Sequence, residues 1–129
     1  MAILKLEQAI ANWTPGTGDA VLANDQSWTG SQRATIVVDN DGSFDLNLGQ
    51  NFQVTPSGAI QITFTNIASA NGQSGYLLLI NSGGHAITLH STSKADANLA
   101  TTCTTAGTYI LSYICDGTNV YLTNSAVMA

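Results

Sequence analysis

Charge is the scarcest feature of this sequence. Charged residues make up 9% of the 129 residues, against roughly 25% in a typical soluble domain. Only Lys5, Arg33 and Lys94 are basic, and the formal net charge is −5. A protein that binds a nucleic-acid backbone or an anionic membrane surface needs a basic footprint. We therefore expect direct binding to neither nucleic acid nor membrane.

Cysteines and long apolar runs are also scarce. Cys103 and Cys115 are too few for a disulfide framework and lack CxxC spacing, so we expect two buried free thiols. The longest apolar run, 76–80, is far shorter than the ~18 residues that span a bilayer. The N-terminus has no basic region followed by a continuous apolar stretch, so we expect no secretory signal and synthesis in a reducing cytoplasm.

Catalytic patterns are missing as well. The sole glutamate is Glu7, and the aspartates lie mostly in turn sequences, where a carboxylate usually accepts backbone hydrogen bonds. The Gly-Gln-Ser-Gly sequence at 72–75 is not the Gly-x-Ser-x-Gly elbow of hydrolases, and it leads directly into an expected strand. We therefore expect no enzyme, and we assign no catalytic or cofactor-binding residue.

The candidate metal ligands do not match a known site. Residues 39–45 resemble a calcium loop only superficially, because Gly42 is at position 4 and Gln50 at position 12, where an EF-hand has Gly at 6 and Glu at 12. A hairpin turn is the better interpretation. His85 and His90 are five residues apart on an expected strand, so they point to opposite faces and cannot share one ion within a chain. Convergence of one histidine from three copies stays an alternative, and we assign no metal site.

From Arg33 onward, short apolar segments alternate with turn sequences about every 8–12 residues. The expected strands cover 34–38, 44–48, 52–54, 60–65, 75–81, 86–89, 108–115 and 119–123. This pattern predicts an all-β domain, specifically an antiparallel β-sandwich with a jelly roll as one variant. We expect no helix after Arg33 and a loop over 91–105. The run 76–80 is apolar at successive positions, so we expect both of its faces to be covered.

The N-terminal region has a different pattern. Four apolar residues recur there at helical spacing, although 3–6 is equally compatible with a strand, and Trp28 lies in a polar loop. We expect an N-terminal arm and loop over 1–31, a sandwich over 32–124 and a frayed tail over 125–129. The candidate contacts to a protein partner or a neighbouring subunit are Ile3, Leu6, Ile10, Trp13 and Trp28. The alternative is that these side chains pack on their own chain.

The order of the strand segments between residues 44 and 121 resembles a module of tailed-bacteriophage virion proteins, of the tail-fibre or head-decoration type. The segments that carry the resemblance are 44–46, 51–55, 60–66, 75–81, 84–89, 107–112 and 116–121. Where that family often has Trp-Pro after a strand, this chain has His90 and Ser91. The resemblance implies a β-rich and commonly trimeric structural part of a virion, with no catalytic residues.

We therefore expect a homotrimeric capsid decoration (cement) protein, made in the host cytoplasm and located in the virion. Its partner on the outside of the head would be the major capsid protein or another virion protein. The expected extra apolar faces on 76–80 and 109–115 suit a subunit interface. One alternative is a small tail-fibre tip or adaptor that recognises a host-surface glycan, for which exposed aromatics rimmed by Asp or Asn would be the sign. The other is a carbohydrate-binding module.

Overall fold

The computed structural model describes residues 31 and 33–128, and the chain divides into two units, 1–32 and 33–129. All the strands and helices named below belong to the second unit. The candidate contact residues Ile3, Leu6, Ile10, Trp13 and Trp28 lie outside the described residues. Their assignment as partner contacts stays a prediction.

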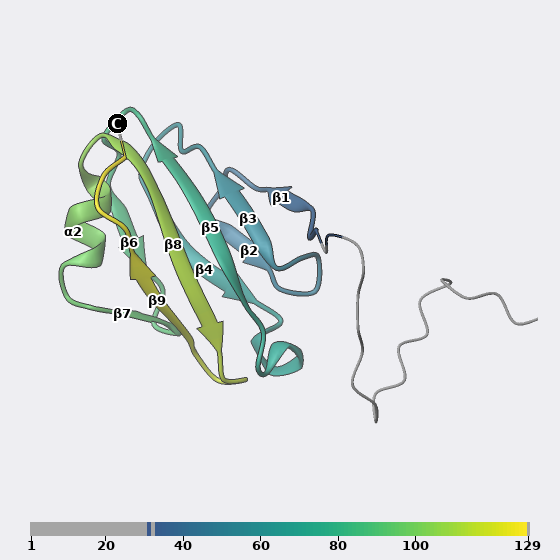
Figure 1. Cartoon of the computed structure of the whole chain (residues 1–129). Helices are drawn as coiled ribbons and strands as arrows, with labels where there is room; N and C mark the ends of the chain where they lie inside the picture. Colours follow the sequence, from purple (N-terminus) through teal and green to yellow (C-terminus); the bar gives the residue numbers. More distant parts are fainter. Residues whose placement is uncertain (1–30, 32, 129) are drawn as a thin grey trace, which may run out of the picture. The chain divides into compact units, whose positions relative to one another are not determined.

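Two β-sheets make up the described unit (Figure 1). The larger sheet contains, in spatial order, β1 (Ile36–Val38), β3 (Asn51–Val54), β5 (Ser74–Asn81), β8 (Gly107–Cys115), β9 (Val120–Asn124) and β7 (Ser93–Ala95). The smaller sheet contains β2 (Ser43–Asp45), β4 (Ile60–Thr65) and β6 (Ile87–Leu89). The prediction of a β-rich domain is confirmed.

From β1 to β6 the chain alternates between the sheets, so that each new strand pairs in parallel with the strand two before it. Strand β7 also pairs in parallel, with β9. Among the described strands, both antiparallel pairs involve β8, which lies between β5 and β9. The expected antiparallel pairing is therefore wrong for five of the seven strand pairs. A jelly roll, which is built from antiparallel strands, does not describe this topology.

The corner at 39–42 shows why the pairing differs from the prediction. The segment carries the chain from β1 in one sheet to β2 in the other, and does not close a hairpin. The carboxylates of Asp39 and Asp41 each accept the backbone N–H two residues on, at 3.2 and 2.7 Å. The Asn40 side-chain oxygen accepts the Thr55 N–H at 2.8 Å and so ties this corner to the next. These polar side chains hold chain reversals in place.

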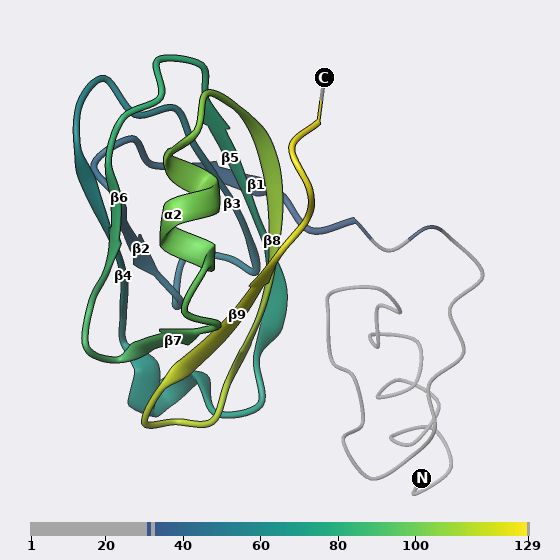
Figure 2. The ribbon, with the colours of Figure 1, turned by 90° about the vertical axis from the view of Figure 1, so that its left-hand side faces the viewer.

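Two short helical segments also depart from the prediction of no helix after Arg33. They are the 3₁₀ turn η1 (Ile67–Ala70) and the helix α2 (Leu99–Thr104), and with β7 the helix replaces the loop expected over 91–105. Helix α2 buries Leu99 and Cys103, which are four residues apart and therefore on one side. Figure 2 shows α2 spanning the opening between β6 of one sheet and β9 of the other.

A single core joins the two sheets. Phe44 of β2 lies 5.4 Å from Phe52 of β3 and 5.5 Å from Phe64 of β4, measured between ring centroids. Tyr113 of β8 closes the cluster at 5.2 Å from Phe64. All four rings are almost completely buried. Because these rings come from both sheets, the inner faces of the sheets pack on one another.

The C-terminal residues 125–128 lie beside the beginning of β8. The Ser125 N–H donates to the Ile110 carbonyl at 2.9 Å, and the Met128 N–H donates to the Thr108 carbonyl at 2.8 Å. This pairing extends the sheet locally. The frayed tail expected for 125–129 stays a prediction, and Ala129 lies outside the described residues.

Candidate interaction surface

One face of the six-stranded sheet packs on the core, whereas the other is open. Along β5, Leu77 and Leu79 are fully buried, while Tyr76 is 58% exposed and Leu78 and Ile80 are half-buried. Successive side chains of a strand point to opposite faces, so the last three lie together on the open side. Other described residues therefore bury the inner face of 76–80. The second face was also expected to be covered, but the described residues leave it open.

The strand register gathers further apolar side chains onto this open side. Tyr76 is in register with Ser112 of β8 and, through Asn51, with Ile36 of β1. In the same way, Leu78 is in register with Ile110. We call the apolar side chains on this side the outer face: Ile36, Val38, Tyr76, Leu78, Ile80, Ile110, Ile114 and Tyr121.

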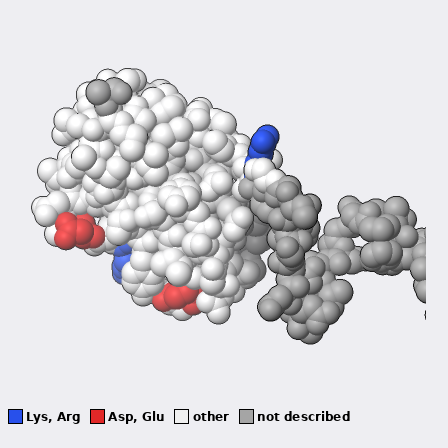
Figure 3. Space-filling model, viewed as in Figure 1, with Lys and Arg blue, Asp and Glu red and all other residues white. Residues whose placement is uncertain are grey.

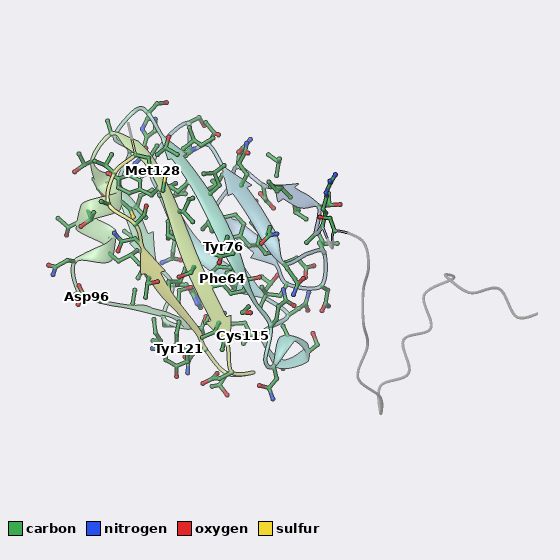
Figure 4. All side chains as sticks on the ribbon, viewed as in Figure 1. Phe64, Tyr76, Asp96, Cys115, Tyr121 and Met128 are labelled. Atoms are coloured by element: carbon green, nitrogen blue, oxygen red, sulfur yellow. The ribbon has the colours of Figure 1, made fainter. Side chains whose placement is uncertain are left out.

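The outer face carries almost no charge. In the described strands of the six-stranded sheet, Lys94 is the one charged residue, and it lies in the edge strand β7. Figure 3, which looks onto this sheet, shows acidic and basic atoms only at the margin. Figure 4 labels Tyr76 and Tyr121, which lie on this side of two strands. The polar residues between the apolar ones are uncharged: Asn51, Gln53, Thr108, Ser112 and Thr123.

A hollow of about 350 Å³ lies within the outer face. Its walls come from four strands, with Ile36, Tyr76, Leu78 and Ile110 as the outer-face members. The exposed side chains of Ile114 and Tyr121 lie elsewhere on the same face. Hollow and exposed side chains of matching apolar character are what a packed protein contact requires.

The rim of the sheet near Tyr121 is held by hydrogen bonds to Asp116. One Asp116 oxygen accepts the backbone N–H groups of Asn119 and Thr118, at 2.7 and 2.8 Å, and the other accepts the Tyr121 hydroxyl at 3.1 Å. The backbone N–H groups of Asn119 and Thr118 lower the pKa of Asp116. The hydrogen bond to this carboxylate in turn raises the pKa of Tyr121. One Asp116 oxygen therefore holds the turn, and the other holds the Tyr121 side chain of β9.

The two histidines weighed as metal ligands lie at opposite ends of one strand, β6. His85 precedes β6 and His90 directly follows it, so the two imidazoles flank that strand rather than lie within it. The Nδ1 of His90 is 2.8 Å from the Thr92 hydroxyl. Over residues 31 and 33–128, no group of three or more His, Cys, Asp or Glu side chains is placed to hold a metal ion.

Both cysteines are free and buried. Cys115 faces the core from β8, as expected, whereas Cys103 lies in α2 and not in a loop. Burial raises the pKa of the Cys103 thiol to about 11, because its surroundings disfavour the charged thiolate. A thiol that stays protonated and buried is a packing group, since the thiolate is the reactive form.

Sequence patterns identified part of the outer face. Extra apolar faces were expected on 76–80 and 109–115, and the structure shows that Tyr76, Leu78, Ile110 and Ile114 are the side chains on the open side of these strands. Ile36, Val38 and Tyr121 were not singled out, because their position beside these residues depends on the pairing of β1 and β9.

Comparison with known proteins yields no relative: no family model, no curated protein and no solved structure matches this chain. In the part of the chain that the structure describes, no helix is long and apolar enough to cross a membrane. The surface itself and the resemblance in strand order are therefore the grounds on which a function can be argued.

Proposed function

We propose that this chain is a non-enzymatic structural protein of a tailed-phage virion, and specifically a homotrimeric decoration protein on the outside of the head. The observation that carries the proposal is the open, uncharged, apolar outer face of the six-stranded sheet. Contiguous apolar surfaces of this kind mark contacts with other proteins. The virion context comes from the resemblance in strand order.

The composition of the surface supports an assembly role. Interface centres are depleted in charged residues and enriched in Tyr and other aromatics. The outer face carries Tyr76 and Tyr121 among aliphatic side chains, and its polar members are amides and hydroxyls. A rigid two-sheet body with such a face suits a protein that is packed among other subunits.

The fold class within this proposal is a β-sandwich of mainly parallel pairing. Its support is the ring cluster of Phe44, Phe52, Phe64 and Tyr113, to which both sheets contribute. In such a sandwich, the side of each sheet that points away from the core is turned to the surroundings.

Attachment to the head is assigned to the N-terminal arm, with the major capsid protein or another virion protein as the partner. The apolar residues Ile3, Leu6, Ile10 and Trp13 supply the contact, at roughly 1.5–3 kcal/mol for each fully buried side chain. A chain lacking residues 1–13 should still melt cooperatively but should lose binding to undecorated capsids. A truncated chain that fails to fold would place these residues in the core of their own chain instead.

The location is tested by antibodies against the recombinant protein, applied to intact virions whose genome encodes the chain. Electron microscopy should show label on the head. Label at the tail tip would favour the tail-fibre alternative. Virions that carry no label, and that also give no band in an immunoblot after denaturation, would overturn the virion assignment.

Recognition of a host-surface glycan is the second candidate, because one observation favours it. A hollow of about 260 Å³ combines Tyr76 with the polar residues Asn51, Ser74 and Ser112. An aromatic ring that stacks on a sugar, flanked by amide and hydroxyl groups, is a common arrangement in small-ligand sites. A glycan array probed with the full chain and with Asn51→Ala tests this candidate: binding that the substitution abolishes would support it.

A further inference from the structure

We propose that the outer face is the surface on which copies of this chain associate, and that the occupant of the face is a second copy. This inference deepens the proposed function, on which it rests for the number of three copies. The side chains named below all lie in the part of the chain that the structure describes.

The first reason is that the outer face is apolar where an open sheet face is normally polar. A sheet with one solvated side alternates apolar and polar residues, yet β5 carries Tyr76, Leu78 and Ile80 at consecutive positions of its open side. The smaller sheet follows the normal rule, because β4 carries Gln61, Thr63 and Thr65 on its open side. The smaller sheet therefore serves as an internal control. Of the two sheets, only the six-stranded one has an open side suited to contact with protein.

The second reason is electrostatic. Each chain has a formal net charge of −5, so identical copies repel unless they meet where acidic groups are absent. Juxtaposed like charges at an interface are costly. Within the described strands of the six-stranded sheet there is no acidic residue at all. Asp116, which accepts the Tyr121 hydroxyl at 3.1 Å, lies at the rim of the outer face, so two acidic copies can approach over the strands of this face without placing strand carboxylates opposite one another.

The third reason is the shape of the face. The hollow lined by Ile36, Tyr76, Leu78 and Ile110 can receive an apolar side chain, and Ile114 is 54% exposed on the same face. In a ring of three copies the contact is head-to-tail, so one part of the face meets a different part of the next copy. Ile114 of one copy entering the hollow of the next satisfies this requirement.

The size of the face sets the expected strength. Its eight apolar side chains lie among the five uncharged polar ones named above. Standard interfaces contain about 20–30 residues on each side, and smaller ones belong to weak complexes. We therefore expect association at micromolar concentrations of the chain.

Sedimentation equilibrium of the full chain between about 1 and 200 μM tests the inference. The wild-type chain should reach about three times its mass of 13.4 kDa. Ile114→Asp should sediment as a monomer throughout, because it places a carboxylate in the apolar contact. The matched control Gln61→Asp adds the same charge to the open side of the smaller sheet and should associate as the wild type does.

Tyr76→Asp is the second variant, used if Ile114→Asp does not melt cooperatively. A wild-type monomer at 200 μM, or an oligomer that both outer-face variants retain, would overturn the inference. A dimer that Ile114→Asp dissociates supports the surface and corrects the copy number. The inference and the proposed function can fail separately. If the chain is a monomer but antibodies against it still label virions, only the proposed interface is wrong. If the chain is an oligomer but no virion is labelled, only the proposed virion role is wrong.

Discussion

The open sides of the two sheets differ although both sheets pack on the same core. The three-stranded sheet turns Gln61, Thr63 and Thr65 outward, with Asp45 in register beside Thr65. The six-stranded sheet turns Tyr76 and its apolar neighbours outward. Because one chain contains both kinds of sheet, the apolar side is not explained by a general lack of polar residues. The difference is what we expect if one open side faces water and the other takes part in the self-association proposed above.

The largest expected effect lies on the inner side that the two sheets share. Phe44 is completely buried between Phe52 and Phe64, so Phe44→Ala should lower the free energy of unfolding by about 3–5 kcal/mol. Urea denaturation at fixed protein concentration measures this loss. An unchanged urea midpoint would show that the two sheets do not depend on a common core. Their open sides could then not be compared as two sides of one folded body.

A smaller loss is expected at the end of β5, where Asn81 is fully buried. Its amide donates to the carbonyls of His85 and Cys103, at 2.8 and 2.9 Å, and its oxygen accepts the His85 N–H at 2.8 Å. Asn81→Ala leaves these backbone groups buried without partners, at a cost of about 1–3 kcal/mol. The same denaturation experiment checks it, and Asn124→Ala, on the half-buried asparagine that ends β9, is the matched control.

Small substitutions on the two open sides test whether only the six-stranded sheet takes part in self-association. Leu78→Ser should weaken self-association at least tenfold, about 1.4 kcal/mol, and should reduce the dependence of the melting temperature on protein concentration at micromolar concentrations. Thr63→Ser should change neither property, since Thr63 lies on the polar side. The melting temperature of each variant is measured at two protein concentrations. If both substitutions change its concentration dependence equally, the two open sides do not differ in self-association.

The smallest effect concerns pH. The side-chain amide of Asn66 and the backbone N–H of Asn47 lower the pKa of Asp45 below its ordinary value. A lowered pKa adds stability above the unfolded-state value of about 3.9, and this stability is lost as the pH falls through the folded-state pKa. Asp45→Asn should therefore flatten the acid side of a stability profile between pH 2 and 5. A variant profile that superimposes on that of the wild type would show that the hydrogen bonds do not act on the carboxylate.

The sequence was sufficient to locate most strands. The alternation of apolar and polar residues in 60–65 predicts β4 with its bounds as found, and the run 75–81 differs from β5 by one residue. The antiparallel pairing predicted from the sequence was wrong for five of the seven strand pairs, because the period of two specifies which face a side chain takes but not which strand lies alongside. The turn residues at 39–42 indicate a reversal equally well for a hairpin and for a passage between sheets.

Helix α2 was missed for a different reason. Its sequence, Leu-Ala-Thr-Thr-Cys-Thr, is rich in threonine, which has a modest helix propensity. Burial of Leu99 and Cys103 at the opening between the sheets stabilises the helix, and that context is tertiary. The outer face was predicted only in part for the same reason. The sequences of β5 and β8 show extra apolar residues directly, whereas the residues of β1 and β9 join the face only through strand register.

The passage of the chain between the sheets also has a consequence for how fast the protein folds. The parallel pairs join residues far apart in sequence, from Ile36 with Asn51 to Ile60 with Ile87. Among the described pairs, the hairpin of β8 and β9, in which Cys115 meets Val120, is the local exception. Domains dominated by non-local pairing fold in milliseconds to seconds, and during that time unpaired strand edges can join those of other chains. The yield of correctly assembled protein is therefore set by this slow search as well as by the stability of the product.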